Sequence, residues 1–113
     1  MYFSQSSSGL GNSSSDISFS AIGEIGLDYY WDKTFVDQQK MAFELQIGWA
    51  LQKDLSIVVH SRESTQDCID IIAKKQDGNL KGIFHCFSGS LHEAMQLIDL
   101  GFLIFLEYFR FYL

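Results

Sequence analysis

Hydrophobic residues recur along the chain in two alternating patterns: short apolar runs of strand length, and longer segments with a period near 3.6 residues. The short runs cover residues 21–27, 55–59, 82–87 and 102–106. The helical segments cover residues 35–53, 65–75 and 91–100. Short runs rich in β-branched and aromatic residues predict buried strands, and the longer period predicts amphipathic helices.

Polar residues mark the ends of the predicted helices. Ser90 and Glu93 form a clean capping box, and Ser64 with Asp67 resembles a second one with a weaker partner. Gly101 is expected to end the last helix. The resulting order, β-α-β-α-β-α-β, predicts an α/β fold in which right-handed crossovers build a parallel sheet.

The flanks differ in composition from this central region. Residues 1–20 are rich in serine and lack an apolar period, so we expect a disordered leader there. Residues 21–106 form the predicted domain, and residues 107–113 form an aromatic tail. At 113 residues the chain is too short for a complete eight-stranded barrel, which takes roughly 200 residues or more.

The chain is acidic, with 8 Lys and Arg against 14 Asp and Glu and a formal net charge of −6. This charge disfavours non-specific binding to phosphate backbones, although a bound metal cation can supply positive charge locally. Cys68 and Cys86 are too few for a disulfide framework, so we expect free thiols in a reducing compartment. No membrane span or signal peptide is visible, so we expect a cytoplasmic protein.

Three polar residues interrupt or end the predicted strands: Glu24, His60 and His85. In parallel α/β folds, functional side chains gather at the carboxyl ends of the strands. A single histidine there is more often a hydrogen-bonded core residue. One Glu and two His at equivalent places on successive units instead suit a divalent metal, so the pattern alone leaves both interpretations open.

The residues around these three also have paired interpretations. Arg62 suits bidentate binding of a phosphate, or it pairs with Glu63 at the surface. Ser88 lies in a loop whose backbone can hold an anion or simply lead into a capped helix. Asp28 is either a carboxylate that supports a metal ligand or a turn former, and residues 29–31 (Tyr29, Tyr30 and Trp31) either stack on a base or pack as a lid.

Three motifs, taken together, carry a resemblance to a known family. They read AIGEIGLDYYWDKTF at 21–35, IVVHSRES at 57–64 and GIFHCFSGS at 82–90, and the first helix adds Gln39, Phe43 and Gln46. In this order and spacing they resemble the TatD family of metal-dependent hydrolases, usually described as deoxyribonucleases. The resemblance covers about residues 21–102.

The resemblance implies a TIM barrel of which this chain holds about four of eight strands. It implies a centre of two divalent metals (Mg, Mn or Zn) that hydrolyses phosphodiester bonds in DNA. At the matching positions, Glu24 would bridge the metals with a catalytic role, and His60 and His85 would be further ligands. Arg62 would stabilise the phosphate, with Ser88 and Tyr29 as further substrate contacts.

The chain departs from the family pattern in its ligands. It has no H-x-H motif, since its only histidines are His60, His85 and His92, and it lacks the Asp of the family's last strand. We therefore expect a partial, poorly active or inactive hydrolase, such as a broken reading frame would produce. The alternatives are a non-catalytic α/β module that dimerises through exposed sheet edges, and a related amidohydrolase with another substrate.

Overall fold

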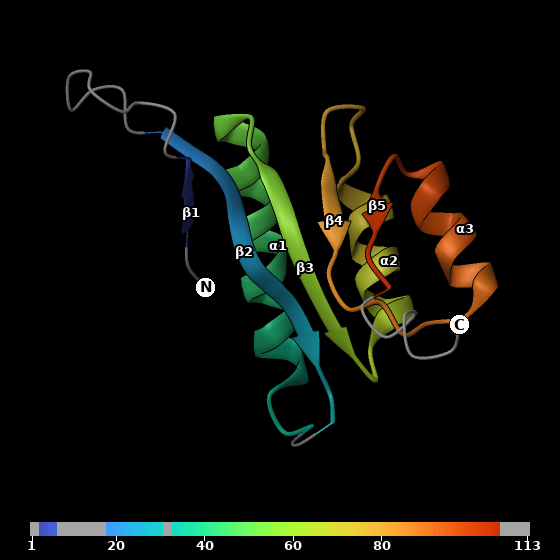
Figure 1. Cartoon of the computed structure of the whole chain (residues 1–113). Helices are drawn as coiled ribbons and strands as arrows, with labels where there is room; N and C mark the ends of the chain where they lie inside the picture. The colour runs from blue at the N-terminus through green and yellow to red at the C-terminus, as the bar shows by residue number, and fades with distance from the viewer. Residues whose placement is uncertain (1–2, 7–17, 31–32, 107–113) are drawn as a thin grey trace.

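The computed structural model describes residues 3–6, 18–30 and 33–106 (Figure 1). The strands are β1 Phe3–Ser6, β2 Ser18–Asp28, β3 Ser56–Arg62, β4 Gly82–Phe84 and β5 Leu103–Ile104. The helices are α1 Val36–Lys53, α2 Thr65–Lys75 and α3 Leu91–Asp99. Within these residues, no helix is both long and apolar enough to cross a membrane.

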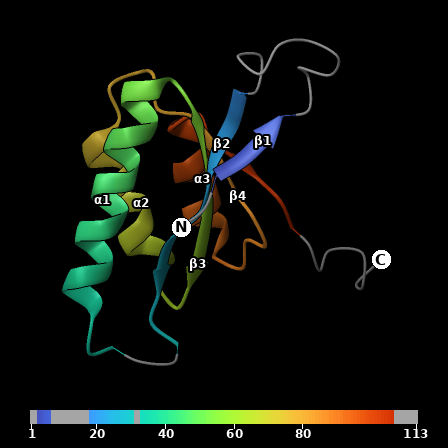
Figure 2. The ribbon, with the colours of Figure 1, turned by 90° about the vertical axis from the view of Figure 1, so that its left-hand side faces the viewer.

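The strands form one sheet in the order β1-β2-β3-β4-β5. β2 to β5 run parallel, and one helix connects each strand to the next, which confirms the predicted α/β fold. In Figure 2, α1 and α2 lie on the same side of the sheet, and each helix packs against the next one along the chain. Among the described residues, helices cover one face of the sheet and leave the other face open, as in one segment of a barrel.

The buried side chains fill the space between the sheet and the helices. The largest are Ile22, Leu27, Phe43, Ile47, Ile57, Ile69, Ile72, Phe84 and Leu97. Each predicted helix contributes to this set, which is the outcome expected for an apolar helical face packed on a sheet.

β3 shows how the sheet separates its two faces. Ile57, Val59 and Ser61 are buried, whereas Val58 and His60 between them are only half-buried. Since successive side chains of a strand point to opposite faces, His60 lies on the open face of the sheet. The strand continues to Arg62, so His60 lies within the strand rather than at its end.

β2 changes its phase midway. Its register against β3 shifts just before Ile25, where β2 carries one extra residue. Ile22 is buried before the shift, and Ile25 and Leu27 are buried after it. Without the extra residue, strict alternation from Ile22 would turn Glu24 and Asp28 toward the helices; the shift turns them toward the open face.

The chain differs from the sequence-based expectation near its N-terminus. Phe3–Ser6 form β1, which pairs antiparallel with the start of β2, and β2 begins at Ser18 rather than at residue 21. For these residues the expectation of disorder is wrong. The rest of the predicted leader and the predicted aromatic tail lie outside the described residues, so the proposed domain limits stay a prediction.

The two predicted capping boxes have different outcomes. At α3 the box is present, because Ser90 accepts from the Glu93 backbone N–H at 3.1 Å and its own N–H donates to the Glu93 carboxylate at 2.9 Å. At α2 the prediction is wrong. The Ser64 hydroxyl instead donates to the Leu27 carbonyl at 2.7 Å, which ties the start of α2 to β2.

Gly26 allows β2 and β3 to approach each other closely. It faces His60 in the register and has φ of +141°, and a Cβ at this position would overlap the His60 carbonyl oxygen. Only glycine satisfies both the backbone angle and the space.

We predict that Gly26→Ala lowers the free energy of unfolding by about 3 kcal/mol, because the methyl group pushes β3 away. Gly48→Ala is the matched control, since Gly48 is exposed within α1 and nothing lies near its added Cβ. That change should stabilise the chain by about 1 kcal/mol. Urea unfolding of both variants checks the pair, and equal effects of the same sign would contradict the role of Gly26.

Candidate functional site

The first pair of site residues joins β2 to the loop after β4. The Glu24 carboxylate Oε2 lies 2.9 Å from His85 Nδ1, although 61 residues separate them along the chain. Both side chains are partly exposed, at 33% and 43% of their surface. His85 follows Phe84 directly, and its backbone N–H donates to the Val59 carbonyl of β3, which fixes its place at the end of β4.

The second pair joins β2 to β3. His60 Nε2 lies 3.3 Å from Asp28 Oδ2, and the other oxygen of Asp28 accepts from the backbone N–H of Tyr30 at 2.9 Å. Asp28 therefore forms the turn after β2, as one interpretation expected, and also contacts His60; its support of a metal ligand stays a prediction.

Gln39 of α1 holds Asp28 in place. Its side-chain Oε1 accepts from the Asp28 backbone N–H at 2.8 Å, and its Nε2 donates to the Asp28 carbonyl at 3.0 Å. The pattern of the sequence predicts no such role for Gln39. An amide reaching from a helix to a strand leaves no periodic signal, and only the spacing between the two elements would reveal it.

The three predicted metal ligands line one cavity of about 440 Å³ on the open face, together with Ser61, Arg62, Cys86 and Ser88. Carboxylate and imidazole groups match the ligands of Zn²⁺ and similar divalent ions. Among residues 3–6, 18–30 and 33–106, however, no group of three or more His, Cys, Asp or Glu side chains is placed to hold a metal ion. The structure gathers the donors as two pairs, Glu24 with His85 and Asp28 with His60.

Both cysteines are free thiols in very different surroundings. Burial raises the pKa of the Cys68 thiol, on the buried face of α2, to about 12. Cys86 is half-buried with φ of 57°, and its sulfur lies 3.4 Å from His85 Nδ1. Cys68 therefore serves the core, whereas Cys86 is part of the cavity wall.

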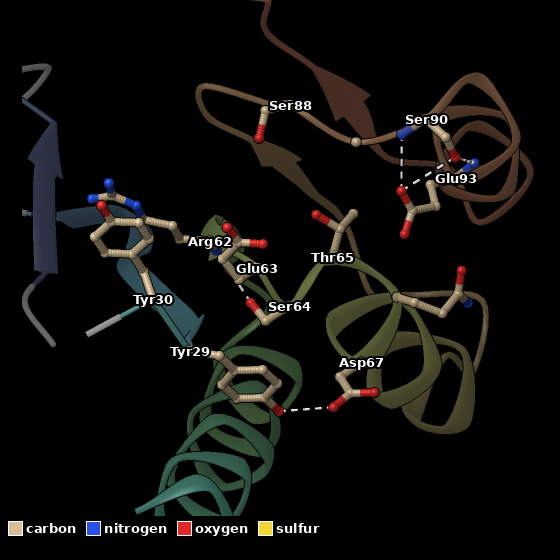
Figure 3. A pocket seen from close by; sticks show the side chains of 12 residues that line it. Tyr29, Tyr30, Arg62, Glu63, Ser64, Thr65, Asp67, Ser88, Ser90 and Glu93 are labelled. Carbon is tan, nitrogen blue, oxygen red and sulfur yellow. Dashed lines mark hydrogen bonds between the residues drawn. The ribbon is translucent and has the colours of Figure 1, made fainter. Parts of the chain in front are cut away.

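Arg62 and Tyr30 form a stacked pair at the end of β3. The guanidinium carbon of Arg62 lies 3.7 Å from the centre of the Tyr30 ring, which is a cation–π contact. Arg62 also lines a second and larger cavity of about 670 Å³, whose far wall includes Ser88 (Figure 3). Trp31, the third aromatic residue of this predicted stacking or lid segment, lies outside the described residues.

Tyr29 lines the larger cavity with its hydroxyl already engaged. That hydroxyl donates to Asp67 Oδ2 at 2.8 Å, and Lys40 lies 3.5 Å from the same oxygen. Burial, reinforced by the hydrogen bond to this carboxylate, raises the pKa of Tyr29 well above its usual range. The ring remains neutral and packs partly against the core.

The fold and the site together define a class. A parallel sheet with helices on one face and polar side chains near its carboxyl edge is the arrangement of a segment of a (β/α) barrel. A sequence model of the family described as "TatD related DNase" matches residues 9–109. The chain therefore belongs to the TatD family.

Individual relatives agree. The chain is 42% identical over 82 residues to the uncharacterized metal-dependent hydrolase YabD of Bacillus subtilis. The aligned segment covers 73% of this chain and 32% of that protein. It resembles the crystal structure of YjjV, a TatD homolog from Escherichia coli, with a TM-score of 0.69 and 31% identity over 74% of this chain and 32% of the other. A TatD family hydrolase from Entamoeba histolytica gives a TM-score of 0.61 at 30% identity, over 75% of this chain and 29% of the other.

These matches confirm the predicted family and the predicted partial barrel. The structural neighbours are TIM barrels, and the chain spans about a third of the length of the relatives it matches. The curated relatives from Bacillus subtilis and Buchnera aphidicola are named metal-dependent hydrolases.

We predict that Gln39→Ala lowers the free energy of unfolding by about 1–2 kcal/mol, because two half-buried hydrogen bonds to Asp28 are lost. Gln96→Ala is the matched control, since Gln96 on α3 makes only exposed side-chain contacts with Gln66. That change should alter stability by less than about 0.5 kcal/mol. Urea unfolding measures both, and equal losses would contradict the role of Gln39.

Proposed function

We propose that the chain carries part of a divalent-metal site that hydrolyses phosphodiester bonds in DNA. The observation that carries the proposal is the contact between Glu24 and His85, which brings a carboxylate and an imidazole from distant parts of the sequence to one edge of the sheet. The family description, which names a DNase, supports DNA as the substrate. A related hydrolase acting on another substrate is the alternative that a cleavage assay decides.

The proposed ligands are Glu24, His60 and His85, because their donor atoms suit Mg²⁺, Mn²⁺ or Zn²⁺ and all three line one cavity. When bound, the metal supplies positive charge opposite the phosphate oxygens and lowers the pKa of a coordinated water. Asp28 orients the His60 ring through the contact between Nε2 and Oδ2. The second metal that the family resemblance implies is proposed only for the longer relatives, and not for this chain.

Three residues are the proposed substrate contacts. Arg62 presents a guanidinium that suits a phosphate, and the Tyr30 ring beneath it limits its motion. Ser88 and Tyr29 line the same larger cavity and would contact the adjoining nucleotide through a hydroxyl and a ring edge. Glu24 and Arg62 are the proposed catalytic residues, because they would touch the reacting phosphate or its metal.

We propose that this chain alone turns over slowly or not at all. The described residues offer pairs of ligands, and the sequence has no H-x-H motif to add to them. The proposed location is the cytoplasm, since both cysteines are free thiols of the kind that a reducing compartment maintains.

We predict that the purified chain binds Mn²⁺ and Zn²⁺ in isothermal titration, and that Glu24→Gln and His85→Ala each weaken this binding by about tenfold or more. His92→Ala is the control, because His92 is exposed on α3 and lines neither cavity. Equal affinity in all four proteins would contradict the ligand assignment. A parallel assay for metal-dependent DNA cleavage, with His60→Ala as its control, tests the substrate separately.

A second candidate function, self-association without catalysis, is favoured by a separate surface. Leu91, Met95 and Ile98 form an exposed stripe along α3, and they are 78%, 58% and 62% exposed. Beside it, β5 is the edge of the sheet within the described residues, with Leu103 67% exposed. An apolar stripe next to an unpaired edge favours a second copy of the chain as its partner, joined edge to edge.

We predict that the chain dimerises in sedimentation velocity, and that Ile98→Glu raises the dimer dissociation constant by about tenfold or more because a carboxylate would be buried at the contact. Met41→Glu is the matched control, since Met41 is 72% exposed on α1, on a different helix. If the chain is monomeric at all concentrations, self-association is contradicted. If the two variants change the dimer dissociation constant equally, the α3 stripe is not the dimer contact.

A further inference from the structure

A cavity of about 670 Å³ lies beside the proposed metal site, at the carboxyl edge of the sheet. It is lined by the end of β3 and by the segments that follow β2, β3 and β4, so it is built from the same edge as the two donor pairs. Figure 3 shows Tyr30 and Arg62 on one side of it, and Ser88, Ser90 and Glu93 on another. Its volume is within the range of sites that take small molecules or parts of larger ones.

This cavity and the one that holds the metal donors share a wall. Arg62 and Ser88 line both of them. A DNA strand whose phosphate lies against Arg62, beside Glu24 and His85, therefore has an adjoining nucleotide next to the larger cavity. The inference that follows rests on the function proposed above.

The charge of the larger cavity decides which part of that nucleotide it takes. Arg62 is the one cation among its lining residues, against the carboxylates of Glu63, Asp67 and Glu93. A phosphate is favoured at Arg62 and repelled from the rest of the cavity. An uncharged group that donates hydrogen bonds suits the remaining space, and a nucleobase is such a group.

One carboxylate is available to accept those hydrogen bonds. Asp67 already accepts from Tyr29 and lies near Lys40, and Glu93 is held in the capping box with Ser90. Glu63 makes no hydrogen bond or ion pair with any residue that the structure describes. Glu63 is exposed, and its φ is 57°. This backbone angle costs roughly 1–2 kcal/mol for a residue other than glycine. The backbone conformation therefore gives no reason for a glutamate at this position.

We propose that the larger cavity is a base-binding subsite, and that it prefers bases with an exocyclic amino group because Glu63 accepts a hydrogen bond from that group. Carboxylates accept in this way from the N4 amino group of cytosine. The exposed ring of Tyr30, stacked on Arg62, lies where it can also contact the base by stacking. Cytosine and uracil separate the two effects, because both present a pyrimidine ring for stacking, whereas at C4 only cytosine carries an amino group and uracil carries a carbonyl oxygen, with N3 an acceptor in cytosine and an N–H donor in uracil.

The test compares single-stranded oligomers of deoxycytidine and deoxyuridine of equal length, with fluorescence anisotropy as the readout. Titrations in Ca²⁺ measure binding by the full chain, and gel analysis of the same samples checks that the oligomers stay intact. We expect the cytosine oligomer to bind about tenfold more tightly. Glu63→Gly, which suits the backbone angle, should remove this preference, and Glu63→Gln should keep part of it through its amide oxygen.

The ratio of the two affinities is the decisive quantity, since a change of net charge alters binding of both oligomers alike. Asp99→Asn is the charge-matched control outside the cavity and should leave the ratio unchanged. Equal binding of the two oligomers, or a preference that survives Glu63→Gly, overturns the subsite alone. Failure of both oligomers to bind overturns the subsite together with the proposed function, and Arg62→Ala should weaken both oligomers without changing their ratio.

Discussion

The site depends on how β2 lies against β3. The two strands pair in parallel from Ala21 opposite Ser56 to Asp28 opposite Arg62, with one extra residue in β2 before Ile25. That residue lets the same strand bury Ile22 in its first half and Ile25 in its second, so Glu24 and Asp28 reach the open face. A strand without the shift would turn both carboxylates into the apolar layer beneath the helices, where unpaired charges are strongly unfavourable.

The same pairing explains why the donors form two pairs rather than one cluster. β2 lies beside β3, and β4 lies on the far side of β3, so Asp28 meets His60 directly whereas Glu24 reaches past β3 to His85. Each imidazole faces one carboxylate in a chain whose formal net charge is −6. Acidic surroundings favour a cation at this edge, and Arg62 adds a positive charge to the wall of the same cavity.

Periodicity predicted the elements that bury apolar side chains, and for that reason α1, α2, α3 and the parallel strands were found from the sequence. It missed features that the backbone or single polar groups determine. β1 pairs through N–H and C=O groups that every residue carries, and Ser64 bonds to the Leu27 carbonyl instead of capping α2. Glu24, His60 and His85 stand out in the sequence as polar residues in or directly after apolar runs, but their pairing depends on the register shift. The two hydrogen bonds from Gln39 to Asp28 depend on the distance from helix to strand.

The donor pairs and the apolar stripe of α3 occupy different surfaces, since Leu91, Met95 and Ile98 line neither of the two cavities. The two are nevertheless coupled by the sheet. A parallel strand added beside β5 would bring its own carboxyl end to the same edge, two strands from His85 on the open face. Any carboxylate or imidazole there would add to the pairs already present. If the proposed metal site is present, edge pairing would therefore be a physical route by which the donor pairs gain further ligands, whether the added strand comes from a second copy or from a longer barrel.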